Sequence, residues 1–216
     1  MLGALQAFGL PAQAQEGSWL RPRAQEVALA RSAAPTAVSD DATVWVLRSD
    51  GFEVASKGGN GFHCMVRRVR DPRDVVPVCF NPAAAERVKP VWQQVVVDVM
   101  DGGSFAASWE AAMDSLDSGV WELPEAGRAL AYMMSAEMRL YDPDTGGERR
   151  YFPHVMVFSP YLTDADIGAS REEVDDVRVP FVAYDGQAGA YLMIPTGPVA
   201  SGIAAEAAAE ASNSER

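Results

Sequence analysis

The chain has 216 residues, of which 48% are hydrophobic and 22% are charged, and 30 acidic against 18 basic side chains give a formal net charge of −12. This length is enough to bury one hydrophobic core, and the composition excludes a fully disordered chain. The excess of acid disfavours broad binding to nucleic acid or anionic lipid, because both need Lys and Arg to neutralise phosphate.

Residues 1–14 have the pattern of an export signal. An apolar stretch precedes Ala12-Gln13-Ala14, the small-x-small arrangement that signal peptidases accept. No Lys or Arg stands before that stretch, so an amphipathic arm packed on the domain is the alternative. We expect export to the periplasm or another extracytoplasmic space.

Residues 15–42 predict an extended arm, because they are rich in Ala, Pro, Ser and Arg without strict periodicity, apart from a helical turn or two around residues 25–30. Trp19 lies in this otherwise polar arm, and an aromatic side chain there is typical of an anchor on another protein or at a membrane interface. We therefore predict a partner-binding segment, which comprises Trp19, Leu20, Arg21 and Arg23.

Four strands are expected next, over residues 43–48, 52–56, 61–69 and 75–80. The first is β-branched and aromatic, with Val44 and Val46 alternating against Trp45 and Leu47. Clusters of Gly, Asp and Asn separate the first three runs and are typical of tight turns. A β-meander is the simplest arrangement of these strands.

A two-helix insertion follows the fourth strand. Asn81-Pro82 predicts a helix start, and apolar side chains continue at helical spacing to Val99, although Pro90 should kink or restart the helix. Ser104 predicts the cap of a second helix, which residues 117–119 end. Its apolar face is formed by Phe105, Trp109, Met113 and Leu116.

Strand patterns return over residues 129–134, 138–141, 155–158, 180–184 and 190–194, with a turn over residues 142–147. Strands on both sides of a pair of helices predict an α+β fold with a mostly antiparallel sheet. We expect a single domain over residues 43–197. Residues 198–216 form an Ala- and Glu-rich tail with no apolar stripe to bury.

Cys64 and Cys79 are the two cysteines, 15 positions apart and on strands that we expect to be adjacent. In an exported protein they should form a disulfide, worth about 3 kcal/mol for a loop of this length. Two buried free thiols, or metal ligation with His63, are the alternatives. A zinc site needs four ligands, and the remaining His154 lacks a usual ligand spacing.

No motif predicts a catalytic centre, and we expect neither an enzyme nor a bound cofactor. His63 and His154 are the two histidines, and each stands among apolar strand residues, which favours a structural role. Acidic side chains gather in residues 164–176, where a solvated loop is the common outcome. The weak candidates for metal ligands there are Asp164, Asp166, Asp175 and Asp176.

Four blocks carry a resemblance to a known family. They are NGFHC, MRLYDPDTG, PHVMVFSPYLTDADIG and PFVAYDGQAGAYLMIPT. These blocks resemble a family of uncharacterised exported bacterial proteins found notably in gemmatimonads, over roughly residues 43–195. The chain is also similar to membrane-extrinsic subunits of the gemmatimonad photosynthetic complex, which implies a reaction centre with its light-harvesting ring as the partner.

Two functions are compatible with these patterns. The first is a non-catalytic extracytoplasmic interaction protein, an accessory subunit that the arm and tail attach to other protein subunits of a membrane complex, peripheral to the bilayer and not spanning it. The second is a secreted hydrolase or small-ligand-binding protein with a cleft near His154, Tyr161 and the acidic loop.

Overall fold

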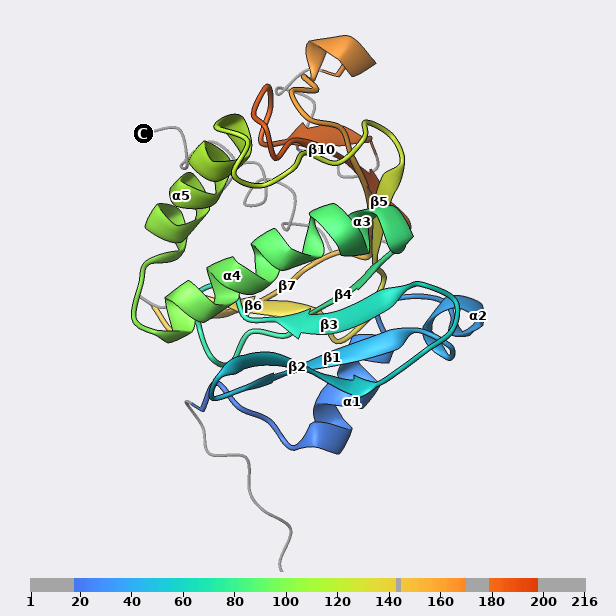
Figure 1. Ribbon diagram of the computed structural model, residues 1–216, viewed down its shortest axis with the longest axis vertical. Coiled ribbons are helices and arrows are strands. Elements are labelled where there is room, and N and C mark those ends of the chain that lie inside the picture. The colour runs from blue at the N-terminus through green and yellow to red at the C-terminus, as the bar shows by residue number, and fades with distance from the viewer. Residues whose placement is uncertain (1–17, 143–144, 170–178, 198–216) are drawn as a thin grey trace, which may run out of the picture.

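One mixed sheet of eight strands forms the centre of the protein (Figure 1). The computed structural model describes residues 18–142, 145–169 and 179–197. Along the sheet the strands are β2 (Gly51–Ser56), β1 (Thr43–Arg48), β3 (His63–Arg67), β4 (Val76–Phe80), β5 (Ala129–Met133), β8 (His154–Phe158), β10 (Tyr191–Pro195) and β9 (Phe181–Ala183). The predicted α+β class is confirmed, since the described helices accompany a largely antiparallel sheet.

The β-meander prediction is wrong at one position. β3 pairs with β1 and runs parallel to it, whereas a meander would place β3 beside β2. The loop between β2 and β3 returns past the start of β1, where the Gly58 amide donates to Thr43 Oγ1. A Cβ on Gly58 would collide with the backbone of Asp41, so glycine is required where the loop crosses.

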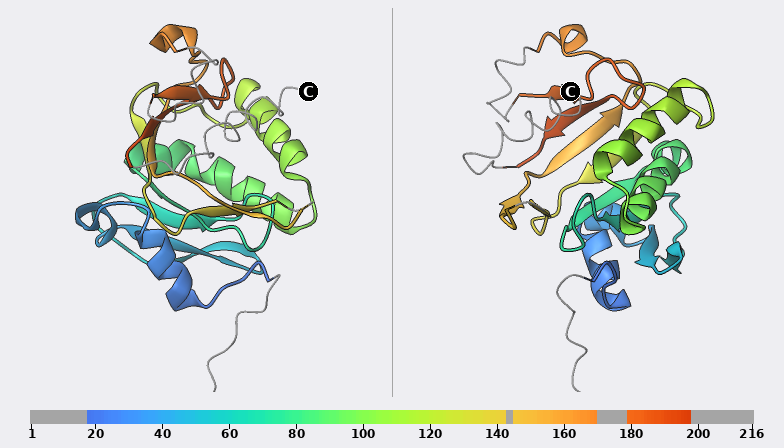
Figure 2. Two further views of the ribbon diagram at one scale, coloured as in Figure 1. Left: turned by 180° about the vertical axis from the view of Figure 1, so that it is seen from behind. Right: turned by 90° about the vertical axis from the view of Figure 1, so that its left-hand side faces the viewer.

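The predicted helices are confirmed. α3 (Pro82–Arg87) begins at Asn81, whose side chain accepts from the Ala84 amide, and α4 (Lys89–Met100) restarts the helix with a proline in its first turn. α5 (Phe105–Asp117) begins at Ser104, whose hydroxyl accepts from Ala107. The side view in Figure 2 shows the green helices α4 and α5 against one face of the sheet.

The prediction of an extended arm is wrong for the described part of residues 15–42. This segment forms α1 (Arg23–Arg31) and α2 (Thr36–Ser39), and α1 packs on β1, β3 and β4. In Figure 1, α1 and α4 lie on opposite sides of these strands. The sequence indicated only a helical turn or two of α1, around residues 25–30, because the buried residues of this helix are a small alanine and an acid, Ala30 and Glu26. The signal-like residues 1–14 and the tail 198–216 lie outside the described residues.

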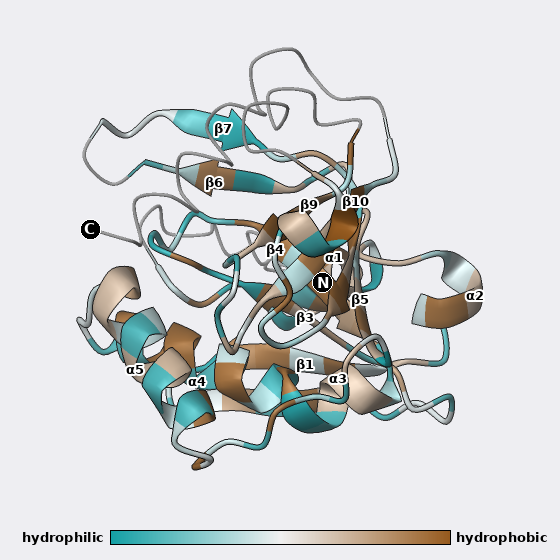
Figure 3. Cartoon of the chain, turned by 90° about the horizontal axis from the view of Figure 1, so that it is seen from above, coloured by the Kyte–Doolittle hydropathy of each residue, from teal (hydrophilic) through white to brown (hydrophobic). Residues whose placement is uncertain are grey.

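A separate hairpin flanks the sheet. β6 (Arg139–Tyr141) pairs with β7 (Glu148–Arg150), and the expected turn over residues 142–147 connects them, with residues 143–144 outside the description. Figure 3 shows β7 as hydrophilic, in contrast to the largely hydrophobic β5 and β10. β6 is anchored to the body of the protein by the bridge between its Arg139 and Val75.

Alternation along β3 divides the interior into two cores. Cys64 and Val66 face α1, whereas Met65 packs with the α4 and α5 core. Cys64 is directly opposite Cys79 on β4, and the two form the predicted disulfide on the α1 side. The disulfide therefore joins two central strands beneath α1.

A buried ion pair attaches α1 to the sheet. Arg68 Nη1 donates to Glu26 Oε1 at 2.7 Å, and both side chains are completely buried. The same carboxylate oxygen accepts from the Leu47 amide on β1 at 3.0 Å. Breaking a buried pair on one side costs more than the pair contributes, because it leaves an uncompensated charge in the interior.

We expect Glu26→Gln to lower the free energy of unfolding by about 3 to 5 kcal/mol, since Arg68 would remain buried without its carboxylate. Urea denaturation at neutral pH measures this loss. The matched control is Glu53→Gln, which removes the half-exposed partner of Arg23 and should cost less than about 1 kcal/mol. Equal losses in the two variants would contradict the role given to Glu26.

Candidate ligand-binding cavity

A cavity of about 120 Å³ lies on the α4 and α5 side of the sheet. Its walls come from β3, β4, β5, β8, β9 and β10, from the first residue of α5, and from residues in and beside the β6–β7 hairpin. Most of the lining is aliphatic, aromatic or methionine. An apolar cavity of about 150 Å³ holds one benzene molecule, so this one suits a ligand of similar size.

Arg67 is the most unusual residue of this lining. Its side chain projects from the end of β3 into the α4 and α5 core, where its Cζ lies 3.6 Å from the ring centroid of Trp92. The residue is 7% exposed, and its Nε is buried without a hydrogen-bond partner. Among the described residues no carboxylate lies within ion-pair distance of it, in contrast to Arg68, which has Glu26.

The positive charge of Arg67 is only partly compensated. Burial lowers the pKa of Arg67, and the influence of Tyr191, Tyr184 and Asp74 opposes this shift, but a guanidinium stays protonated at neutral pH. Moving one ion into a protein interior costs several kcal/mol, and a desolvated cation–π contact returns about 2 kcal/mol. The cavity wall therefore contains a buried positive charge that the described residues compensate only in part.

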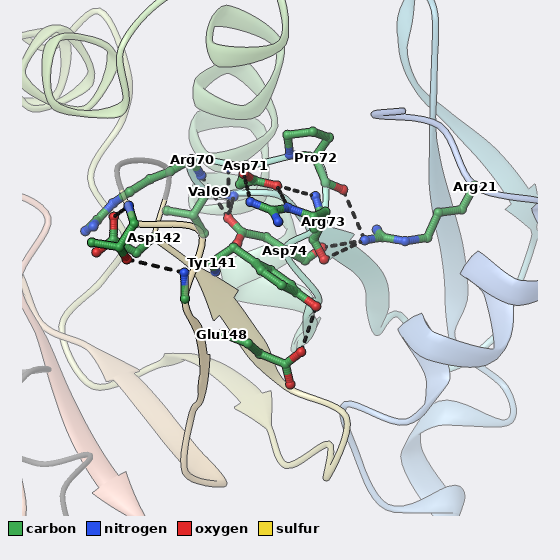
Figure 4. Close-up of polar contacts among 12 residues, drawn as sticks. Arg21, Val69, Arg70, Asp71, Pro72, Arg73, Asp74, Tyr141, Asp142 and Glu148 are labelled. Carbon is green, nitrogen blue, oxygen red and sulfur yellow. Dashed lines mark hydrogen bonds and ion pairs between the residues drawn. The ribbon is translucent and has the colours of Figure 1, made fainter. Parts of the chain in front are cut away.

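Asp74 holds the loop that leaves Arg67 (Figure 4). Its Oδ2 accepts from the amides of Val69, Arg70 and Asp71, and its Oδ1 accepts from the amide of Tyr141 on β6. Burial raises the pKa of Asp74, and these backbone hydrogen bonds oppose that shift. Because the carboxylate is already engaged by four amides, it is the fixed centre of the loop and does not pair with Arg67.

Arg21 closes the same loop from the N-terminal side. Its Nη2 donates to the carbonyl oxygens of Pro72, Arg73 and Asp74, at 3.1, 3.0 and 2.8 Å, and Figure 4 shows it reaching the loop from the segment before α1. Arg70, in this loop, is the exposed arginine of the cavity lining, with its Cζ 5.7 Å from the Phe105 ring centroid. The segment before α1 thus stabilises one rim of the cavity.

Tyr184 lines the cavity in a strained backbone conformation. Its φ is +56°, a region that bulky residues rarely adopt and that costs about 1 to 3 kcal/mol. Its ring stacks on Trp109 of α5 with centroids 4.5 Å apart. Sequence reasoning missed this residue, although the turn residues Asp185 and Gly186 directly after it marked a sharp change of direction.

His154 lines the cavity, as the second functional hypothesis requires. It is 1% exposed, and its Nδ1 lies 2.8 Å from the Phe152 carbonyl, so Nδ1 carries the proton and donates while Nε2 remains an acceptor. Burial lowers the pKa of His154 to about 4, which keeps the ring neutral at physiological pH. His63 lies apart from the cavity, and its Nδ1 accepts from Trp45 Nε1 at 3.3 Å.

The other residues proposed for that cleft are not brought together with His154. Tyr161 is half-exposed, does not line the cavity, and donates to Asp117 on α5. Asp164 accepts from the Val182 amide, and Asp166 accepts from the amide and hydroxyl of Thr163. Two of the metal candidates, Asp175 and Asp176, lie outside the described residues. No cluster of three or more His, Cys, Asp or Glu able to hold a metal occurs within the described part.

The predicted partner-binding residues divide into two kinds. Arg21 and Arg23 bind within the chain, Arg21 at the loop described above and Arg23 through Glu53 and the carbonyls of Val54 and Ala55. Trp19 is half-buried and Leu20 is 38% exposed. Their role toward a partner stays a prediction.

Comparison of the chain with protein-family models, curated proteins and solved structures finds no match. The resemblance to exported gemmatimonad proteins therefore stays a prediction. None of the helices in the described residues has the length and apolar character needed to cross a bilayer.

His154 should make the protein less stable in acid. Its pKa is about 4 when folded and about 6.5 when unfolded, so the stability it contributes is complete above pH 6.5 and is lost as the pH falls toward 4. Between pH 7 and 4.5 the free energy of unfolding should fall by about 2 kcal/mol more in the wild type than in His154→Gln. Urea denaturation at the two pH values measures both losses, and parallel losses would contradict the assignment.

Proposed function

We propose that the protein is an extracytoplasmic binding protein that holds a small organic ligand in the cavity between the sheet and α5. The observation that carries this proposal is the convergence of two buried polar side chains, Arg67 and His154, on a mostly apolar cavity. The strained backbone at Tyr184 supports it, because strain of this kind concentrates at functional sites.

The composition of the lining favours binding over hydrolysis. Within the described residues, the cavity wall contains no Ser, Thr, Cys, Lys, Asp or Glu, and apart from the two arginines its ionisable groups are His154 and the phenols of Tyr151, Tyr184 and Tyr191. His154 is oriented by a backbone carbonyl instead of a carboxylate, and an imidazole with a pKa of about 4 is a weak base at neutral pH. These features support a non-catalytic role.

The disulfide supports an extracytoplasmic location. Disulfides such as Cys64–Cys79 persist in oxidising compartments and are rare in the cytosol. Here the bond joins directly opposite residues of two buried strands.

The cavity should bind benzyl alcohol, a neutral ring of suitable size, with an affinity on the order of millimolar. With 13C-methyl methionine, the NMR signals of Met133, Met138 and Met193, which line the cavity, should shift and saturate, whereas that of Met100 should not. Ala183→Leu fills the cavity and should weaken binding about tenfold or more. The control Ala107→Leu adds the same volume on the exposed side of α5. If the cavity methionine signals of the wild type do not saturate as benzyl alcohol is added, the proposed function is wrong.

Attachment to a membrane complex, such as a photosynthetic reaction centre with its light-harvesting ring, is a second candidate function. The observation that favours it is the exposed apolar side chain of Leu20 next to Trp19. Such a contact would bury both apolar groups against another protein subunit.

If this second function is correct, Leu20→Asp should reduce co-sedimentation with membranes of the source cells about tenfold, because a charge would enter an apolar contact. The matched control is Val120→Asp, which places the same charge at an apolar residue that is 75% exposed. Val120 follows α5 and is 100 positions from Leu20 in the sequence. Equal sedimentation of wild type, variant and control would argue against attachment through Leu20.

A further inference from the structure

We propose that the cavity selects small monocarboxylates with an apolar body, about the size of benzoate, and that Arg67 is the residue that binds the carboxylate. This inference rests on the proposed binding function and specifies its ligand class. The inference follows from the guanidinium of Arg67. This is the buried guanidinium of the cavity lining, and the described residues provide no hydrogen-bond acceptor for it.

The position of Arg67 prepares it for a planar anion. The Cζ atom of Arg67 lies 3.6 Å from the Trp92 ring centroid, and a guanidinium that stacks on the indole would direct its N–H groups past the ring. A carboxylate pairs with such an edge through two parallel hydrogen bonds. Trp92 itself is buried and is held by edge contacts with Phe80 and Phe158, so the guanidinium rests on a rigid surface.

Among the described residues, the two completely buried carboxylates are engaged elsewhere. Glu26 pairs with Arg68 on the other side of the sheet, and Asp74 accepts four backbone amides. Arg67, the last residue of β3, and Arg68, which follows it, therefore point to opposite faces of the sheet. The described residues supply a counter-ion to Arg68 but none to Arg67. The carboxylate of a bound ligand would be the counter-ion of Arg67.

The rest of the lining determines what carries the carboxylate. The same cavity wall contains Phe181, Ala183 and Met193, which are buried apolar side chains. These groups cannot replace the hydration of inorganic phosphate, whereas they bury an aromatic ring or a short aliphatic chain favourably. A volume of about 120 Å³ limits that body to one ring or a few methylene groups.

The test compares benzoate, benzyl alcohol and inorganic phosphate on the wild-type protein at neutral pH, by calorimetry and by the methionine methyl shifts. We expect benzoate to bind about tenfold or more tightly than benzyl alcohol, and phosphate not to shift the cavity methyls. If benzoate binds no more tightly than benzyl alcohol, the carboxylate inference is wrong while the binding function stands. If neither ring compound binds, both proposals fail.

Arg67→Met tests the residue. It keeps an unbranched side chain as long as the arginine stem up to Nε and removes the guanidinium carbon that lies over Trp92, so we expect benzyl alcohol to bind within about threefold of wild type and benzoate to weaken about thirtyfold or more. The melting temperature of the unliganded variant should equal or exceed that of wild type, because an unpartnered buried cation is removed. The control Arg128→Met removes an exposed arginine and should leave both affinities unchanged.

Two results for this variant would overturn the assignment of Arg67. One is undiminished benzoate affinity in Arg67→Met, and the other is equal loss of benzoate and benzyl alcohol. Should Arg67→Met fail to fold, Arg67→Lys is the second variant. Lysine retains the charge but cannot form the bidentate pair of hydrogen bonds, so the affinity for benzoate should fall about threefold to tenfold while that for benzyl alcohol does not. Unchanged selectivity in Arg67→Lys together with selective phosphate binding would indicate a simple anion site instead.

Discussion

The structure depends on the burial of two consecutive guanidinium groups at the end of β3. Because side chains alternate along a strand, Arg67 enters the α4 and α5 core and Arg68 enters the interface with α1. Both are within the interior, where an ion without a partner is costly. How the chain treats each of them accounts for the attachment of α1 on one side and the character of the cavity on the other.

On the α1 side the charge is neutralised within the chain. Glu26 accepts from Arg68 and from the Leu47 amide, and so joins the helix to two strands at once. On the cavity side the charge rests on Trp92 with no carboxylate among the described residues. The protein thus retains two unfavourable features in the wall of one cavity, the buried charge of Arg67 and the positive φ of Tyr184. Stability is commonly given up in this way at sites that bind a ligand.

The elements that sequence reasoning identified are those with local physical causes. Asn81 and Ser104 cap helices through side-chain bonds three residues away, and the proline after Lys89 restarts a helix. The disulfide followed from two cysteines on neighbouring strands. The position of β3 was missed, although its run of apolar residues, Cys64 to Val66, is typical of a strand covered on both faces and hence central. Only a turn or two of α1 was indicated, because alanine and a buried acid leave no apolar periodicity.

By itself, the sequence determined the α+β class, the boundaries of α3, α4 and α5, most of the strands and the disulfide, since these depend on contacts within a few residues or on the presence of a single pair of cysteines. It also singled out His154, which proved to line the cavity. Only the tertiary structure decided that Arg68 meets a carboxylate and Arg67 does not, and that Arg21 closes the Asp74 loop instead of remaining free in an arm. These outcomes depend on residues about 40 to 50 positions apart, and the energy of a charge depends on its final burial and neighbours, which no local pattern specifies.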